Sequence, residues 1–462
     1  MGLYNNRQAP VPKGPGTTPK GIDMNETQNY PLRLGIQSNK IFLPVAAGFA
    51  ENAARALGLE HGESLVMRLA AEEVFIHLCK NLKSDNKVEM TCAWGGYFAK
   101  LSFLYHGRIP LRAFNLTATV SLDDEGSLDD MGLVLASRSV DRFEIGEDAG
   151  DRIRLSLVKE KTYPPGPEEP LPPLDSVDAC SVHSPQAEEL KVFARRVTGR
   201  YLPRLIPGFF SYPGKVVDMV LRGDFQALLA VDTGGQVAGG IMWHPGRTKF
   251  MEFFGPYRLT SDESTTIMHD LVEAFLMAVG KSDAVGVYCP LPAEPLAAFH
   301  FEELGSLDTF EEDGKRIPMP VFFRQIHEDP GATVWCHPDL EGFVSNVYER
   351  HYLPRSIRLV QGMGETFGDD SVFLTHMDSI RKMVVLKPMQ FGTDLDQNLA
   401  DHVKLFSRQD FKEVFFQLDL GVSWHSHLVP ALLNNRFVPR LVVPYGGQSD
   451  LVIFQWDGSG YE

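Results

Sequence analysis

A carboxylate and an imidazole four residues apart are the first pair in this sequence that could do chemistry. Glu73 and His77 lie in LAAEEVFIHLCKNL, a stretch whose apolar residues recur close to helical spacing. That spacing places both side chains on one helix face. The alternative is structural: Glu72 belongs to the solvated side of the helix, and His77 is packed or hydrogen-bonded within the fold.

A second set of candidates lies in the C-terminal half of the chain. Tyr288 and Cys289 end the strand AVGVYCPLP, where either could donate a proton; the alternative is that both are buried strand residues. The loop GPYRLTSDESTTIMHDL runs from a strand into a helix and carries Arg258, Ser261 and Thr265. Backbone N–H groups at a helix N-terminus can bind an anion, so this loop is a candidate phosphate site.

The composition excludes several classes of function. The chain has 462 residues and a formal net charge of −16, which disfavours binding to nucleic acid or to an anionic membrane surface. The five cysteines include no Cys-x-x-Cys pair, which indicates a reducing compartment, and we expect no metal site. No apolar run approaches the roughly 20 residues of a membrane span, so we expect a cytoplasmic protein.

Proline and glycine divide the chain into five segments. Residues 1–30 lack apolar periodicity and are expected to form a disordered tail. Residues 161–185 contain YPPGPEEPLPPLDS, which predicts a stiff linker between domains. The linker separates a module at 31–160 from a larger part, which consists of two blocks of similar pattern at 186–327 and 328–462.

Hydrophobic periodicity predicts mixed elements in both parts. The N-terminal module reads as an extended run, a helix capped by Asn39, a second helix, a hairpin turning at Gly95–Gly96, an acidic loop, a helix and strands. The two blocks alternate helices with strands and hairpins, and the first includes the expected helix EPLAAFHFEELG. Trp243 and the aromatic residues of KFMEFFGPY are expected in the core. This order indicates an α+β fold with mixed sheets.

The order of elements in residues 31–160 resembles the histidine-kinase-like (GHKL) ATPases, in particular their anti-sigma-factor serine kinase branch. In that family a Glu acts as general base and an Asn four residues later helps to ligate Mg²⁺. Glu73 matches the Glu, whereas His77 stands in place of the Asn. The resemblance implies a two-layer α/β sandwich, an ATP site, a protein partner of the sigma-factor or anti-sigma antagonist type, and a homodimer.

Three departures from the family pattern predict a degenerate ATP site. The imidazole of His77 is a poor ligand for Mg²⁺. The family motif Asp-x-Gly, whose Asp binds the adenine amino group, reads Tyr105-His106-Gly107 here. The phosphate lid keeps Gly132, but it carries carboxylates that repel a triphosphate: Asp123, Asp124, Glu125, Asp129 and Asp130. His77, Gly107 and Gly132 are then the remaining ATP-site-like positions, Glu73 is a vestigial base, and we expect no kinase activity.

The C-terminal part resembles the GNAT acyltransferases, in two copies. The first copy is carried by LLAVDTGGQVAGGIMW, KFMEFFGPY and AVGVYCPLP with their intervening helices, and the second by ALLNNRFVPRLVVPYGG and DLVIFQW. The resemblance implies binding of acetyl-CoA, with its pyrophosphate on the loop of Arg258, Ser261 and Thr265 and with Tyr288 protonating the leaving thiolate. That loop and its counterpart KPMQFGTDLDQNL lack the family's glycine-rich pattern, which predicts weak or atypical binding of the cofactor.

Three functions are consistent with these observations. We expect first a regulatory or signalling protein, in which a degenerate GHKL domain binds a protein partner and a GNAT-like region binds an acyl-CoA. The first alternative is a working N-acetyltransferase that the N-terminal domain regulates. The second alternative is an active serine kinase of the anti-sigma class, against which Tyr105 and His77 argue.

Overall fold

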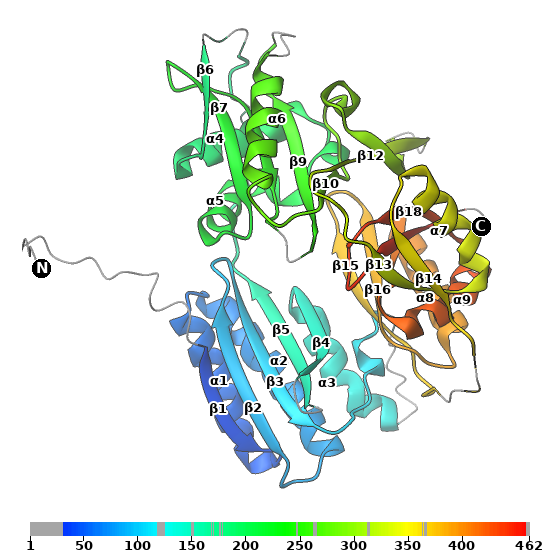
Figure 1. Ribbon diagram of the computed structural model, residues 1–462. Helices are drawn as coiled ribbons and strands as arrows, with labels where there is room; N and C mark the ends of the chain where they lie inside the picture. The colour runs from blue at the N-terminus through cyan, green and yellow to red at the C-terminus, as the bar shows by residue number, and fades with distance from the viewer. Residues whose placement is uncertain are drawn as a thin grey trace, which may run out of the picture.

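Three lobes of mixed helix and sheet make up the molecule (Figure 1). The computed structural model describes residues 31–117, 125–148, 152–167, 169, 171–174, 177, 179–245, 248–261, 266–311, 315–362, 364 and 367–458. The lobes are the N-terminal domain, the part from β6 to β12 (residues 180–325), which we call the first unit, and the part from β13 to β19 (residues 332–456), which we call the second unit. Among the described residues, no helix is both long enough and apolar enough to cross a membrane.

The N-terminal domain is an antiparallel sheet covered on one face by helices. Its strands, in the order β1-β2-β3-β5-β4, are β1 (Leu32–Gln37), β2 (Lys87–Trp94), β3 (Phe98–His106), β4 (Arg142–Asp148) and β5 (Arg152–Glu160). Its helices are η2 (Lys40–Phe42), α1 (Leu43–Ala56), α2 (His61–Asn81), η3 (Arg112–Phe114) and α3 (Glu125–Ser139). Alternate strand residues such as Met90, Leu101 and Leu157 pack beneath α1, α2 and α3 in one core.

The first unit is built on one sheet with helices on both faces. Its strands are β6 (Cys180–His183), β7 (Gln226–Asp232), β8 (Val237–Trp243), β9 (Phe250–Arg258), β10 (Gly286–Cys289), β11 (Glu302–Phe310) and β12 (Arg316–Gln325). Its helices are α4 (Ala187–Arg200), η4 (Pro203–Leu205), η5 (Gly208–Ser211), α5 (Pro213–Arg222), α6 (Thr266–Val279) and η6 (Leu296–Phe299). Phe254 and Tyr257 pack toward α4 and α5, whereas Phe253 packs toward α6.

The strand order of the first unit is β6-β7-β8-β9-β10-β12-β11, and β9 and β10 form its parallel pair. Their pairing runs from Phe250↔Gly286 to Glu252↔Tyr288, and β9 then continues to Arg258 without β10 beside it. The two strands therefore separate just beyond Glu252 and Tyr288. The expected core aromatics Trp243, Phe253, Phe254 and Tyr257 are all buried.

Two sequence expectations fail in the first unit. The segment 161–185, expected to be linker throughout, ends in β6, whose residues pair with β7 from Cys180↔Asp232 to His183↔Leu229. The expected helix EPLAAFHFEELG is instead the short η6 followed by β11, which pairs with β12. In both cases hydrogen bonding to a neighbouring strand overrides the local propensity.

The second unit repeats the pattern in shorter form. Its main sheet has the order β15-β16-β17-β19-β18 with β16 and β17 parallel, and β13 and β14 form a separate parallel pair. The strands are β13 (Ala332–Cys336), β14 (Arg355–Leu359), β15 (Val372–Asp378), β16 (Met383–Gln390), β17 (Glu413–Asp419), β18 (Phe437–Val443) and β19 (Leu451–Trp456). The helices are α7 (Pro338–Arg350), α8 (Leu395–Arg408), η7 (Ser423–Leu428) and α9 (Val429–Asn434).

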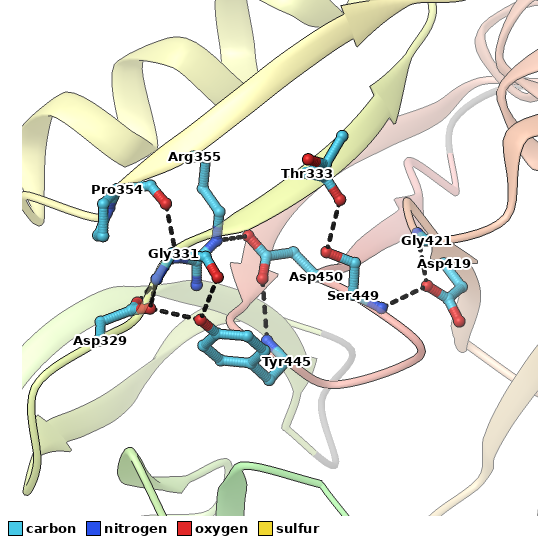
Figure 2. A network of polar contacts seen from close by, with 10 residues as sticks. All are labelled: Asp329, Gly331, Thr333, Pro354, Arg355, Asp419, Gly421, Tyr445, Ser449 and Asp450. Atoms are coloured by element: carbon cyan, nitrogen blue, oxygen red, sulfur yellow. Dashed lines mark hydrogen bonds and ion pairs between the residues drawn. The ribbon is translucent and has the colours of Figure 1, made fainter.

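A buried ion network holds the second unit together (Figure 2). Arg355, at the start of β14, binds Asp450 through Nε at 2.7 Å and Asp329 through Nη1 at 2.8 Å. Asp450 also accepts a hydrogen bond from the backbone N–H of Tyr445 at 2.9 Å, and the Tyr445 hydroxyl donates to Asp329. The side chains of Arg355 and Asp450 are both 0% exposed, so each charge depends on the other.

The lobes contact one another through both apolar and polar groups. Phe250 and Val321 of the first unit share a core with Leu441 and Val443 of the second. Asn115 of the N-terminal domain donates to the backbone carbonyl of Ser371 at 2.7 Å and accepts from the N–H of Phe373 at 3.0 Å. These contacts fix the position of the second unit against both other lobes.

Candidate functional site

A cavity of about 1580 Å³ lies where the three lobes meet, and we call it the central cavity. All three lobes contribute to its wall. Among the lining residues are Phe98 and Arg142 from the N-terminal domain, Glu252 and Tyr288 from the first unit, and Arg381 and Lys387 from the second. A volume of this size suits a ligand site, since small-molecule sites are concave and commonly of several hundred Å³ or more.

Strand alternation explains which side chains of β9 and β10 reach the central cavity. Glu252 and Phe254 line the cavity, whereas Met251 and Phe253, which alternate with them along β9, pack beneath α6. Glu252 pairs in register with Tyr288 at the last position before β9 and β10 separate. The carboxylate and the phenol are therefore neighbours in the cavity wall, at the opening between the two strands.

Burial adjusts both groups toward proton transfer. Loss of solvent raises the pKa of Glu252 to about 7, although the positive charges of Lys387 and Arg381 act to lower it. Loss of solvent also raises the pKa of Tyr288 well above its ordinary value, and the neighbouring Glu252 and Cys289 raise it further. Near neutral pH, Glu252 can accept a proton and Tyr288 keeps one to donate.

Of the two candidates at the end of β10, the structure brings Tyr288 to the cavity and leaves Cys289 beneath it. Cys289 is fully buried in the core under α6, with its thiol 3.9 Å from the Gly255 carbonyl oxygen. Burial raises the pKa of this thiol, so it remains protonated. Sequence reasoning did not single out Glu252; the signal was a lone carboxylate in the apolar strand KFMEFFGPY.

The predicted phosphate loop of the first unit is engaged by the protein itself. The Arg258 guanidinium pairs with Glu294 at 2.9 Å, and its backbone N–H donates to the Tyr201 hydroxyl at 2.8 Å. The N–H of Ser261 donates to the carbonyl of Leu174, a linker residue, at 2.8 Å. Thr265 lies outside the described residues. Arg258 and Ser261 would therefore have to exchange partners to hold the phosphates of an acyl-CoA.

The counterpart loop of the second unit is closed. Gly392 pairs with Gly368, and a Cβ at Gly392 would lie 2.1 Å from the carbonyl carbon of Asp370. The N–H of Ser371 donates to the Asp394 carboxylate at 2.5 Å, just before α8 begins. The chain itself therefore covers the N-terminus of α8, and the residues present do not fit a pyrophosphate there.

Glu73 and Gly132, two positions of the predicted degenerate ATP site, lie against each other in the N-terminal domain. The Glu73 carboxylate lies against α3 at Gly132, where an added Cβ would come within 1.7 Å of Glu73 Oε2. Burial, followed by the charge of Glu72, raises the pKa of Glu73. Gly132 is therefore required for the close approach of α3 to α2 at this carboxylate.

The other ATP-site-like positions serve the fold. His77 is 6% exposed, and its Nε2 lies 2.8 Å from the Pro110 carbonyl oxygen, which ties α2 to the segment after β3. Gly107 has φ of +107°, a conformation that glycine adopts readily, as β3 ends. Tyr105 is fully buried in the core, at the position of the family's adenine-binding Asp.

The acidic phosphate lid predicted from the sequence lies mainly outside the described residues. Asp123 and Asp124 lie outside the described residues, as do the side chains of Glu125, Asp129 and Asp130. Across the described parts of the chain, no group of three or more His, Cys, Asp or Glu side chains is arranged to hold a metal ion.

Comparisons with solved structures find acetyltransferases that cover about a third of this chain. No protein-family model and no curated protein matches this chain. An N-acetyltransferase from Staphylococcus aureus Mu50 is 11% identical, with 32% of this chain and 100% of that chain covered and a TM-score of 0.28. A GNAT superfamily phosphinothricin acetyltransferase from Sinorhizobium meliloti, in complex with AcCoA, is 15% identical over 32% and 89%, with a TM-score of 0.26.

A ribosomal-protein-S5-alanine acetyltransferase from Vibrio fischeri is 14% identical over 33% of this chain and 96% of its own, with a TM-score of 0.27. TM-scores this low carry no functional argument. In this chain, residues 180–325 form a sheet of strands β6 to β12 in which β9 and β10 are the parallel pair. Function has to be argued from the site.

Proposed function

We propose that this protein is an N-acyltransferase whose first unit carries out the chemistry. The observation that carries the proposal is the register pair of Glu252 and Tyr288, which faces the central cavity where β9 and β10 separate. The N-terminal domain and the second unit complete the wall around that pair. Of the three functions considered from the sequence, this geometry favours the working N-acetyltransferase.

An acyl-CoA, when bound, supplies an acyl group as a thioester. The neutral amine attacks the thioester carbon with its lone pair, and as the new C–N bond forms the Glu252 carboxylate takes the proton that the nitrogen loses. As the C–S bond breaks with its electron pair on sulfur, the Tyr288 hydroxyl donates its proton to the departing thiolate. Solvent in the cavity then returns a proton to Tyr288 and removes one from Glu252, so charge and protons balance.

Support for the first unit over the second comes from the two loops. In the first unit one backbone N–H, that of Ser261, is bound by the linker at Leu174, and α6 begins just beyond. In the second unit the chain fills the equivalent space at Gly392 with atoms of Asp370 and Ser371. Ser261 and the start of α6 are the groups that would hold the phosphates of the cofactor.

For the N-terminal domain we propose a GHKL-like scaffold that has lost its ATP site. An antiparallel sheet with three helices on one face supports the scaffold. The ring of His77 on Pro110 and the burial of Tyr105 support the loss of Mg²⁺-ATP binding and of kinase activity. A sigma-factor-type or anti-sigma partner, a homodimer and a signalling role stay predictions.

The test is acetyl transfer by the full chain, measured as free thiol released from acetyl-CoA in the presence of amines. Glu252→Gln and Tyr288→Phe should each lower kcat/KM by about 10²–10⁴-fold, the usual contribution of a general base or acid. Glu303→Gln, an exposed position on β11, is the matched control and should leave turnover unchanged. Turnover unaffected by Glu252→Gln would refute the proposed site.

A further inference from the structure

Most carboxylates in the wall of the central cavity are already bonded. Glu144 pairs with Lys100, Glu160 with Lys215, and Asp141 with Lys159. Asp308 pairs with Arg440 and Arg316. Glu413 accepts a hydrogen bond from the Thr309 hydroxyl, and Asp378 accepts hydrogen bonds from backbone N–H groups. Asp224 is hydrogen-bonded to Tyr97. The Glu252 carboxylate, in contrast, forms no hydrogen bond or ion pair within the described residues.

Three cations of the wall form no ion pair with a carboxylate among the described residues, although Lys387 and Arg381 are near enough to Glu252 to act on its pKa. They are Arg142 from β4, Arg381 from the turn between β15 and β16, and Lys387 from β16. Arg142 contacts the ring of Phe98, with its guanidinium carbon 5.2 Å from the ring centroid. The Nε atoms of Arg142 and Arg381 are buried without a hydrogen-bond partner.

The fold aims these cations into one space. Along β16, Met383, Val385 and Lys387 line the cavity, while Val384 and Leu386 pack in the core under α8. Lys387 thus lies on the cavity face of the second unit's sheet, and Arg381 lies at the turn that ends the same hairpin. Arg142 enters from the N-terminal domain, so the three charges come from two lobes and Glu252 from the third.

We propose that the acyl acceptor is a primary amine that also carries an anionic group, with the anion held by Lys387, Arg381 and Arg142 and the amine directed at Glu252. This inference rests on the proposed acyl transfer. Hydrogen bonds between charged groups are the strong ones, so three cations that line one cavity favour a ligand that carries an anion. A polycationic amine would instead be repelled by the same three charges.

Lys387, Arg381 and Arg142 change the pKa values of the same cavity residues, which agrees with their lining one cavity. Lys387 and Arg381 both act to lower the pKa of Glu252. Burial lowers the pKa of His376, on the cavity face of β15, and both Lys387 and Arg142 lower it further. Lys387 therefore acts on the same pKa as Arg381 at Glu252, and on the same pKa as Arg142 at His376.

The experiment compares four amines as acceptors for the full chain with acetyl-CoA: γ-aminobutyrate, O-phosphoethanolamine, γ-aminobutyramide and putrescine. The first and second carry a carboxylate and a phosphate, and their ranking identifies the anion. We expect a KM about tenfold or more lower for at least one of them than for the neutral amide and the diamine. A lower KM for putrescine or for the amide would overturn the inference.

The variant Lys387→Met sharpens the result. It should raise the KM for the preferred anionic amine about tenfold or more while leaving the KM for γ-aminobutyramide within about twofold. Lys404→Met, an exposed lysine on α8, is the control and should change neither. An equal change of KM for all four amines in Lys387→Met would contradict an anion site at this residue.

Calorimetry separates this inference from the proposed function. If no amine is acetylated, the proposed acyl transfer fails, and direct titration of the four amines into the wild-type chain decides the second question. Binding of γ-aminobutyrate or O-phosphoethanolamine that Lys387→Met abolishes would keep the anion site. Absence of binding, or equal binding of all four, would remove it.

Discussion

The two units share a five-strand order, β8-β9-β10-β12-β11 in the first and β15-β16-β17-β19-β18 in the second, but they contribute different groups to the central cavity. In the first unit the parallel pair β9–β10 ends at Glu252 and Tyr288, and the strands then separate. In the second unit the parallel pair β16–β17 ends at Leu386 and Phe416, and the following loop is covered at Gly392. The first unit thus presents a carboxylate and a phenol to the central cavity and the second presents Lys387, so a repeated strand order does not imply a repeated function.

The second unit contains a buried ion pair, Arg355 with Asp450, whose side chains are both 0% exposed. Asp450→Ala would leave Arg355 without its main partner in a fully buried position. We expect a loss of about 3–5 kcal/mol in the free energy of unfolding, the usual cost of an uncompensated buried charge. Urea denaturation measures this loss.

The control for that experiment is Asp339→Ala, whose carboxylate is 58% exposed on α7 beside His337. Its effect should be within about 0.5 kcal/mol, as for most surface substitutions. Equal effects of the two substitutions would show that the network in Figure 2 does not hold the second unit.

A substitution in the loop at Gly392 of the second unit should cause a smaller loss in the free energy of unfolding. Gly392→Ala would bring a Cβ within 2.1 Å of two backbone atoms, the Asp370 carbonyl carbon and the Ser371 nitrogen, so one of the segments must move. We expect about 1–3 kcal/mol of destabilisation, as for other overpacked sites, and no change in affinity for acetyl-CoA. Gly342→Ala, with nothing within 4 Å of the added Cβ, should be neutral or stabilising. Tighter acetyl-CoA binding by Gly392→Ala would show that the second unit takes part in cofactor binding.

The smallest effect concerns the pH dependence of turnover. The pKa of Glu252 is raised to about 7, so the deprotonated base, and with it kcat/KM, should increase as pH rises through that value. Lys387 acts to lower this pKa, so Lys387→Met should move the rising limb to higher pH, by less than about one unit. If kcat/KM of Lys387→Met rises at the same pH as in the wild type, the second unit does not act on the pKa of Glu252.

Local patterns in the sequence predicted local structure well. The turn at Gly95–Gly96 joins β2 to β3, and the Asn39 side chain accepts from the N–H of Ile41 at a helix start. Strand β6 was not expected because a four-residue edge strand after a proline-rich segment carries little periodicity. Its pairing with β7, 46 or more residues later in the chain, becomes evident once the sheet is assembled.

The candidate site was partly predictable. Tyr288 could be selected because it ends an apolar strand, and its position in the cavity agrees with that choice. Glu252 was passed over because one carboxylate in an aromatic strand gives no motif. Arg142 and Lys387 could not be connected to the site at all, since their placement depends on how three lobes pack, for example through Asn115 and Ser371.

Hydrogen–deuterium exchange of the full chain with and without acetyl-CoA tests the central claim most directly, because it reports on both units in one experiment. The account predicts slower exchange in residues 250–261 and 286–291 of the first unit and no change in residues 383–394 of the second. Protection of residues 383–394, or no protection in either unit at saturating acetyl-CoA, would contradict the assignment of acyl transfer to the first unit.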